Sequence, residues 1–277
     1  MEFMRLRGIM VVLASAVPAC CLGQAGDAAL PTPANEVAAG VAAPDVRPAA
    51  RPGYDGVPID PSAPVRVIIE SPGANEVIPD TAVAVRVRAE NYHLVEGGNR
   101  LQVVLDNRRS VLVYDATQPL LFTNLSRGGH MLRAFAVAGD GRFVVGEGAF
   151  AATVFHSLGQ GVENVPEPGE PVLTVSSPRG MYEGQAAALV VFDYRIHGVS
   201  LSPTGYRLRF LLDGRERITH EPGPVFFPAL GPGTHRLVAE IVDLDDVAVP
   251  GIYSRVGSTF EVRPAGLPEV ETQPAPR

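Results

Sequence analysis

The sequence is poor in the residues that most often provide cross-links or reactive groups. It has two cysteines and no tryptophan among 277 residues, and aromatic residues make up 6% of the chain. Cys20 and Cys21 are adjacent, so a disulfide between them would be strained and would close no loop. The folded part must therefore be held together by core packing, without thiolate metal sites or cysteine redox chemistry.

The chain also lacks a cluster of basic residues. Charged residues are 19% of the total and the formal net charge is −7 at pH 7, which argues against a nucleic acid or an anionic membrane surface as partner. No GxSxG or SxxK nucleophile motif and no phosphate-binding glycine loop occurs, so we expect no enzymatic activity and no cofactor.

No apolar run is long enough for a permanent membrane span. Ile9–Val17 is the apolar core of a segment that begins with Arg5 and Arg7, and such a short core after basic residues is typical of a signal peptide. We predict a signal peptide over residues 1–23. Translation from Met1 or from Met4 gives the same mature chain.

The signal ends in Val17-Pro18-Ala19-Cys20, which resembles the lipobox of bacterial lipoproteins. The resemblance implies that Cys20 is lipidated, although Val17 and Pro18 depart from the commoner pattern. Cleavage after Ala25 and an uncleaved anchor are the alternatives. The protein is therefore expected in the cell envelope, lipid-anchored or periplasmic, or alternatively secreted, and it meets the membrane only through a lipid or the signal peptide.

The strongest feature of the sequence is an internal duplication. LQVVLD at Leu101–Asp106 returns as LRFLLD at Leu208–Asp213, and LSRGGHML at Leu125–Leu132 returns as LGPGTHRL at Leu230–Leu237. Each copy has about 90 residues, the size of one small sandwich domain. We therefore predict domains at 64–156 and 171–264, joined by a linker at 157–170. A disordered Pro/Ala-rich tether at 24–63 precedes them, and a disordered tail at 265–277 follows.

Within each copy the apolar residues alternate with polar ones, as in strands that bury one face. The predicted strands of the first copy are Val65–Ile69, Ala82–Ala89, Leu101–Leu105, Ser110–Tyr114, Leu120–Thr123, His130–Ala138 and Ala149–Phe155. Those of the second are Val172–Ser176, Ala187–Ile196, Tyr206–Leu212, Arg217–His220, Val225–Phe227, His235–Val242 and Ser258–Val262. Seven short strands per copy predict an all-β chain with two tandem antiparallel sandwiches.

The same alternation predicts the core and two hairpins. The residues predicted to point inward are Leu101, Val103, Leu105, Leu132, Ala134 and Ala136, with Leu208, Phe210, Leu212, Leu237, Ala239 and Ile241 in the second copy. Arg209, Arg236 and Glu240 should point to water. Asp106-Asn107 and Asp213-Gly214 are expected to close equivalent hairpins, because these residue types tolerate positive φ.

The order of Ser-Pro, a long strand, LxVxLD(G/N), LxxGxHxLxA and a final Phe-containing strand resembles the immunoglobulin-like or fibronectin-type-III-like modules of exported bacterial proteins. The resemblance covers 64–155 and 171–264 and implies the sandwich fold. It says little about function, because such modules serve as spacers and as binding units. A cysteine pair and a core tryptophan are lacking, so an antibody-type domain is excluded.

Three groups of residues could carry function. His130 and His235 follow glycine turns at equivalent positions, and a hydrogen-bonded histidine at a strand start explains both without a metal. Asp243, Asp245 and Asp246 crowd one turn and form a weak calcium candidate, against a solvated turn. Tyr182, Tyr194, Tyr206 and Tyr253 are concentrated in the second copy and could stack on sugars.

These observations favour a non-enzymatic envelope protein that binds or spaces, presenting two Ig-like domains to a protein or an envelope polymer. The alternative is a carbohydrate- or polymer-binding module that uses the tyrosines of the second domain. A second alternative is an enzyme without a recognisable motif. The sequence leaves the oligomeric state open.

Overall fold

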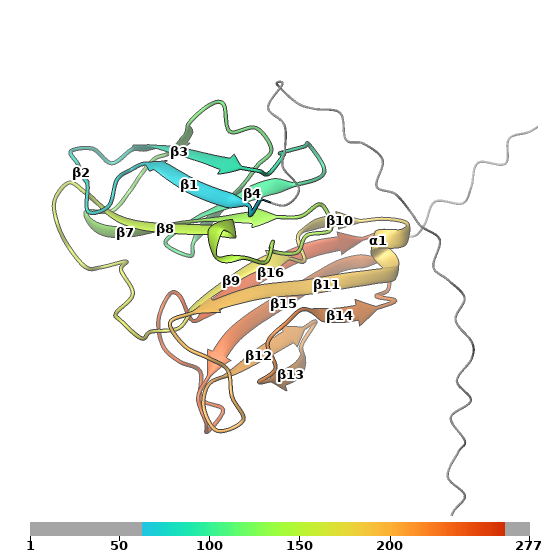
Figure 1. Cartoon of the computed structure of the whole chain (residues 1–277). Helices are drawn as coiled ribbons and strands as arrows, with labels where there is room; N and C mark the ends of the chain where they lie inside the picture. The colour runs from blue at the N-terminus through green and yellow to red at the C-terminus, as the bar shows by residue number, and fades with distance from the viewer. Residues whose placement is uncertain (1–62, 264–277) are drawn as a thin grey trace, which may run out of the picture. The chain divides into compact units, whose positions relative to one another are not determined.

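The computed structural model describes residues 63–263 (Figure 1). The predicted signal peptide, the lipidation of Cys20, the tether and the tail fall outside the described residues. Both copies of the repeat belong to one compact unit of the chain. Within the described range the chain forms sixteen strands arranged in four sheets, with one short α-helix and one 3₁₀ turn.

The first sandwich pairs a three-stranded sheet, in the order β1-β3-β6, with a five-stranded sheet, in the order β2-β8-β7-β4-β5. Its elements are β1 (Arg66–Ser71), β2 (Val77–Ile78), β3 (Val83–Glu90), β4 (Arg100–Leu105), β5 (Arg109–Val113), β6 (Leu120–Phe122), β7 (Gly128–Val137), the 3₁₀ turn η1 (Glu147–Ala149) and β8 (Phe150–Ser157).

The second sandwich repeats this arrangement with a three-stranded sheet, β14-β11-β9, and a five-stranded sheet, β10-β16-β15-β12-β13. Its elements are β9 (Val172–Ser177), β10 (Gly180–Tyr182), α1 (Gln185–Ala188), β11 (Leu189–His197), β12 (Arg207–Leu212), β13 (Arg215–Thr219), β14 (Val225–Pro228), β15 (Gly233–Val242) and β16 (Arg255–Val262). The predicted fold class of two tandem antiparallel sandwiches is confirmed.

Each sandwich has its own apolar core between its two sheets. All twelve residues predicted to point inward are buried, from Leu101, which is fully covered, to Leu212, which is 9% exposed. The alternation along a strand places every second side chain on the same face, so a sheet with one face on the core shows this period. The rest of each core comes from the three-stranded sheet, with Val85 and Phe122 in the first copy and Phe192 and Phe227 in the second.

The two predicted hairpins are present with the expected backbone. Asp106 and Asn107 have φ of 50° and 53°, and Asp213 and Gly214 have φ of 51° and 80°. Positive φ at both central residues matches the right-handed twist of the flanking strands. These turns join β4 to β5 and β12 to β13.

Two short strands were absent from the sequence prediction. β2 and β10 follow Ser71-Pro72 and Ser177-Pro178, where the chain leaves the three-stranded sheet and pairs in parallel with the last strand of the five-stranded sheet. Strands of two or three residues show no alternation over which a period could be recognised. The strand predicted from Ala187 was also too early, because α1 occupies that position and β11 begins at Leu189.

The prediction that Glu240 is exposed to water is wrong, although the residue lies on the outer face. Arg236 is exposed as predicted, but Glu240 is only 7% exposed. Its Oε1 accepts a hydrogen bond from Nε of Arg209 at 2.8 Å, and Arg255 flanks its other oxygen. The parity of Glu240 is as predicted, but the long arginine side chains of the neighbouring strands cover its carboxylate from water.

Candidate functional site

Along β4 and β7, the outer face of the five-stranded sheet in the first sandwich is buried as well as its inner face. Every residue of β7 except Met131 is buried, and all six residues of β9 are buried. Leu173 and Val175 of β9 belong to the core of the second sandwich, so by alternation Thr174 and Ser176 face the other way. Hydrogen bonds from the first sandwich reach this face of β9, which therefore forms part of a contact between the two sandwiches.

Arg133 on β7 lies at the centre of this contact and is fully buried. Its Nη1 donates to the hydroxyl of Thr174, and its Nη2 donates to Oδ1 of Asn107 at 2.8 Å. The guanidinium carbon lies 5.4 Å from the ring centroid of Tyr253, a cation–π distance. Burial lowers the pKa of Arg133 to about 10, which still leaves the guanidinium charged at neutral pH.

Further hydrogen bonds connect the two sandwiches around Arg133. Nε2 of Gln102 donates to the carbonyl of Val175 at 2.9 Å, and Nδ2 of Asn107 donates to the carbonyl of Ile252 at 2.9 Å. The backbone N–H of Phe143 donates to Oδ2 of Asp193 at 2.6 Å. Burial raises the pKa of Asp193, although the N–H of Phe143 and the charge of Arg195 favour its ionised form.

The repeat is broken at the positions that make this contact. Arg133 corresponds to Val238 of the second copy, and Phe135 corresponds to Glu240. In the second copy this face carries the ion pair of Glu240 with Arg209. The two copies therefore share their inward residues and differ on one outer face.

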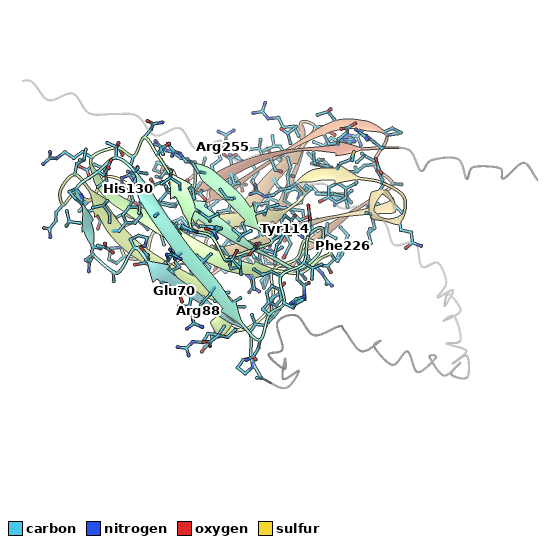
Figure 2. All side chains as sticks on the ribbon, turned by 90° about the horizontal axis from the view of Figure 1, so that it is seen from above. Glu70, Arg88, Tyr114, His130, Phe226 and Arg255 are labelled. Atoms are coloured by element: carbon cyan, nitrogen blue, oxygen red, sulfur yellow. The ribbon has the colours of Figure 1, made fainter. Side chains whose placement is uncertain are left out.

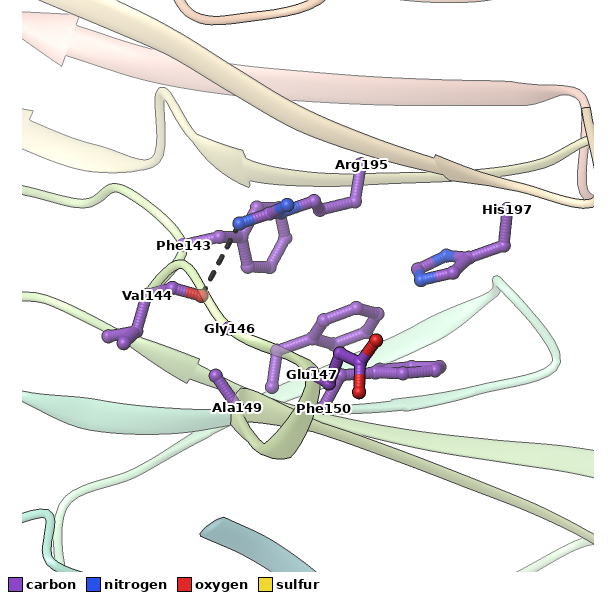
Figure 3. A pocket seen from close by; sticks show the side chains of 9 residues that line it. Phe143, Val144, Gly146, Glu147, Ala149, Phe150, Arg195 and His197 are labelled. Atoms are coloured by element: carbon purple, nitrogen blue, oxygen red, sulfur yellow. Dashed lines mark hydrogen bonds between the residues drawn. The ribbon is translucent and has the colours of Figure 1, made fainter. Parts of the chain in front are cut away.

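A hollow of about 500 Å³ lies beside this contact (Figure 3). Its first wall comes from the first sandwich, where the ring of Phe135 packs against those of Phe143 and Phe150, with centroids 4.9 and 4.7 Å away. The opposite wall is β11 of the second sandwich, with Arg195 and His197 two residues apart. We call this space the aromatic hollow.

The β11 wall of the aromatic hollow carries one positive charge, that of Arg195. Nη2 of Arg195 donates to the carbonyl of Val144 at 3.3 Å, as the dashed line in Figure 3 shows. The ring of His197 stacks on Phe150 with centroids 4.4 Å apart. Burial, with the positive charges of Arg133 and Arg195, lowers the pKa of His197, and its Nδ1 has no hydrogen-bond partner.

A second hollow of about 700 Å³ adjoins the first and shares Phe143 and Arg195 with it. It runs along the end of β11, where the three-stranded sheet is incomplete. β14 pairs with β11 only from Leu189 to Phe192, so among the described strands none pairs with that edge of Asp193–His197. The two hollows form one groove, with an aromatic floor and an unpaired strand edge, and with Arg195 where the two hollows meet.

The two equivalent histidines make the same contacts in both sandwiches. Nδ1 of His130 lies 2.6 Å from Oδ2 of Asp106, and Nδ1 of His235 lies 2.7 Å from Oδ2 of Asp213. Their Nε2 atoms face the carbonyls of Ser126 and Gly231. Figure 2 shows His130 in the first sandwich, and it is not among the residues that line the groove. These contacts are those of hydrogen-bonded histidines at the start of a strand.

The carboxylates of the Asp243 turn are engaged in the turn itself. Oδ1 of Asp243 accepts the backbone N–H of Asp245 and of Val247, both at 2.9 Å, and Asp246 pairs with Arg207. Within residues 63–263, no three His, Cys, Asp or Glu side chains converge as a group that could hold a metal ion.

The four tyrosines of the second copy are not gathered on one surface. Tyr194 and Tyr253 are buried, the first in the core and the second over Arg133. Tyr182 and Tyr206 pack against the same core from its margin, and the hydroxyl of Tyr182 lies 2.9 Å from Oγ of Ser177. Of the four, only Tyr194 lines the groove.

In the described part of the chain, no helix has the length and apolar character needed to span a bilayer. No protein-family model matches the sequence, and no curated protein matches it significantly.

Several solved structures are similar to the chain. The fibronectin(III)-like modules of Clostridium thermocellum CbhA match with 18% identity and a TM-score of 0.27, over 76% of this chain and all of theirs. The central fibronectin-III array of RIM-binding protein matches with 11% identity and a TM-score of 0.25, over 76% of this chain and 73% of its own. The CARDB domain of the Pyrococcus furiosus PF1109 protein matches with 12% identity and a TM-score of 0.25, over 35% of this chain and 94% of its own.

At these identities and TM-scores, the similarities carry no conclusion about this chain. The description of the chain as two tandem antiparallel β-sandwiches rests on the strand order given above.

The residues of the groove and of the contact beside it were not found from the sequence. A usable signal was present, because Phe135 and Arg133 occupy outward positions where the second copy has Glu240 and Val238. An aromatic residue that replaces a charged one on the outer face of a repeat indicates that this face is covered in one copy only.

Proposed function

We propose that this chain is a non-enzymatic cell-envelope protein that acts as a binding or spacer protein. It presents its two sandwiches as one unit to a protein partner. The observation that carries the proposal is the buried contact around Arg133. The guanidinium of Arg133 is buried there, and it donates hydrogen bonds to Asn107 of the first sandwich and to Thr174 of the second. A buried charge is tolerated only where its partners are held in place. Two domains joined in this way present their surfaces in a single relative orientation.

An exposed apolar strip on the second sandwich supports a protein partner. Val191 of β11 and Phe226 of β14 are register partners, and Leu189 lies two residues before Val191. Leu189 is 47% exposed and Phe226 is 45% exposed. These residues share the outer face of the three-stranded sheet, and Phe226 is labelled in Figure 2. Exposed apolar side chains that adjoin one another are typical of protein-binding surfaces.

The equivalent face of the first sandwich is charged. Nε of Arg88 on β3 lies 2.7 Å from Oε1 of Glu70 on β1, and both are labelled in Figure 2. Glu90 also pairs with Arg88. Charged residues on the outer face of a sheet keep it in water and oppose association. The difference between the copies therefore favours the second sandwich as the side that receives a partner.

Site-specific photo-crosslinking in the intact envelope tests the proposal. A photoreactive residue at Phe226 is expected to give a discrete protein adduct. The same residue at Glu216, which is exposed on the charged edge strand β13, serves as the control and should give none. Saturable binding of the purified protein to envelope glycans, without a protein adduct at Phe226, would contradict a protein partner and favour the carbohydrate-binding alternative.

A further inference from the structure

The residues directly before β1, Pro64 and Val65, lie beside the aromatic hollow. Nδ2 of Asn91 donates to the carbonyl of Pro64 at 3.3 Å. A Cβ atom on Gly148 would lie 2.4 Å from the carbonyl oxygen of Val65, so η1 packs directly on this residue. Both ends of η1 line the aromatic hollow. The chain at Pro64 and Val65 therefore lies next to the aromatic hollow.

The groove has a defined chemical preference. Its floor is made of phenylalanine rings, which favour another aromatic ring. Arg195 and His197 project from the same face of β11. Glu147 is the one acidic residue that lines the aromatic hollow, whereas Asp140 and Asp193 line the adjoining hollow, so an acidic group of an occupant is favoured beside Arg195. The Nδ1 atom of His197 is buried without a hydrogen-bond partner, which leaves a polar group for an occupant to satisfy. The matching occupant carries an aromatic ring next to a carboxylate.

Such a pair occurs once in the segment that leads into β1. Tyr54 is the only aromatic residue between residues 24 and 62, and Asp55 follows it directly. Residues 52–62 carry two acids, Asp55 and Asp60, and no basic residue. The charge of this segment is therefore opposite to that of Arg195, the cationic side chain of the aromatic hollow.

The length of chain permits the contact. Val65 lies eleven positions after Tyr54, and an extended chain of this length spans at most about 35–40 Å. A short connection of this kind keeps the segment at an effective concentration of the order of millimolar beside the groove. A weak contact is therefore enough to populate the docked form.

We propose that residues 52–62 fold back into the groove of their own chain. The ring of Tyr54 enters the aromatic hollow against Phe143 and Phe150, and the carboxylate of Asp55 faces Arg195. Docking leaves residues 24–51 as the free part of the tether, so it shortens the reach of the sandwiches. A partner that takes the groove releases the segment and lengthens that reach. This inference goes beyond the proposed function and does not depend on the strip at Phe226.

The absence of tryptophan from the chain allows a direct test. The exported protein with Tyr54→Trp contains a single tryptophan, whose emission and quenching by acrylamide report its exposure. Docking predicts emission at shorter wavelength and quenching at least about twofold weaker than for Val37→Trp, a control earlier in the tether, because the effective concentration is of millimolar order. Equal quenching of the two variants would overturn the proposal.

Exchanging the charges at positions 55 and 195 tests whether Asp55 faces Arg195 in the docked form. Adding Asp55→Arg to the Tyr54→Trp chain is expected to return the quenching to the control value. Adding Arg195→Glu as well should restore protection, because the two charges are then exchanged. Thermal unfolding of each variant monitors the sandwiches, since Arg195 also bonds to Val144. Protection that survives Asp55→Arg, or that increases with protein concentration, would contradict docking within one chain.

Discussion

The side chains of His130 and Asp106 join the start of β7 to the turn between β4 and β5, with Nδ1 and Oδ2 2.6 Å apart. The other oxygen of Asp106 accepts the backbone N–H of Met131 at 3.0 Å. His235 and Asp213 repeat the arrangement, with the N–H of Arg236 in the place of Met131. A residue pair repeated with the same atoms in both copies is part of how each sandwich closes its hairpin.

The first prediction concerns pH. Burial opposes the charged form of His130 and His235, but the aspartate and a backbone carbonyl outweigh it and raise both pKa values. Other groups act on these pairs: Glu163 also favours the charged form of His130, and Arg215 favours ionised Asp213. A raised pKa means that the folded state holds the proton more tightly than the unfolded state. Their contribution to the free energy of unfolding is therefore complete below a pH of about 6.5 and is lost as the pH rises through the folded pKa.

Urea unfolding from pH 5.5 to 9 measures this effect. The double variant His130→Gln and His235→Gln should lose the decline with rising pH that we expect in the parent. His197 acts in the opposite direction, because its pKa is lowered and its contribution is lost as the pH falls. His197→Gln is therefore the matched control and should make the decline steeper. An unchanged pH profile in the double variant would show that the two pairs do not titrate in this range.

The second prediction compares the two aspartates. In Asp106→Asn, the amide oxygen can still accept the backbone N–H of Met131. The amide N–H₂ then faces Nδ1–H of His130, so two donors oppose each other and the hydrogen bond to His130 is lost. Loss of a hydrogen bond to a buried charged group costs about 1–3 kcal/mol. Asp213→Asn should cost less, because the side chain of Asp213 is 44% exposed and that of Asp106 is 11% exposed. Urea denaturation of both variants at pH 6 gives the comparison, and equal losses would contradict it.

The third prediction concerns Arg133. Arg133→Ala removes a buried guanidinium, leaves Asn107 and Thr174 without this partner, and opens a cavity, at a cost of about 2–4 kcal/mol. Val238→Ala at the equivalent, partly exposed position is the control and should cost about 1 kcal/mol or less.

Calorimetry distinguishes the role of Arg133 in joining the sandwiches from a role within one of them. The parent should unfold in one transition, and Arg133→Ala should separate the unfolding of the two sandwiches into two transitions. Two transitions in the parent protein would show that the contact at Arg133 does not couple them.

The fourth prediction tests the packing of η1 on Val65. A Cβ at Gly148 meets the backbone oxygen of Val65 at 2.4 Å, and backbone cannot yield as a flexible side chain does. Gly148→Ala should therefore lower the free energy of unfolding by about 1–3 kcal/mol. Gly257→Ala on β16 is the control, because nothing lies within 4 Å of its Cβ position. Thermal unfolding of both variants checks the difference, and similar melting temperatures would contradict it.

Most of the fold could be predicted from residue patterns, because the repeat shows its period twice. The strands from Leu101 and from Leu208 have the same inward residues, and both hairpin turns carry residues that accept positive φ. The burial of Glu240 by the neighbouring arginine side chains was not predicted. The alternation of residues along a strand tells only on which side of the sheet a residue lies. It does not tell whether the arginines of neighbouring strands will close over that residue.

The groove was not among the sites predicted from the sequence. The tyrosines and the aspartate turn were selected by residue type, and the structure uses Tyr194 and Tyr253 in packing and Asp243 within its own turn. The groove depends on Phe143 and Arg195, which are 52 residues apart in sequence. Their approach depends on the packing of β7 against β9, and no local pattern encodes that packing.

By itself, the sequence determined the two copies, their strands, their inward faces and their closing hairpins, because alternation and turn chemistry are local properties that repeat along the chain. Only the tertiary structure decided which outer face is covered, how Arg133 is buried between the sandwiches and where the groove opens. Those features depend on pairs such as Arg133 with Thr174 and Phe143 with Asp193. The partners in such pairs are distant in sequence, and the free energy of their contact exists only once both sandwiches have folded.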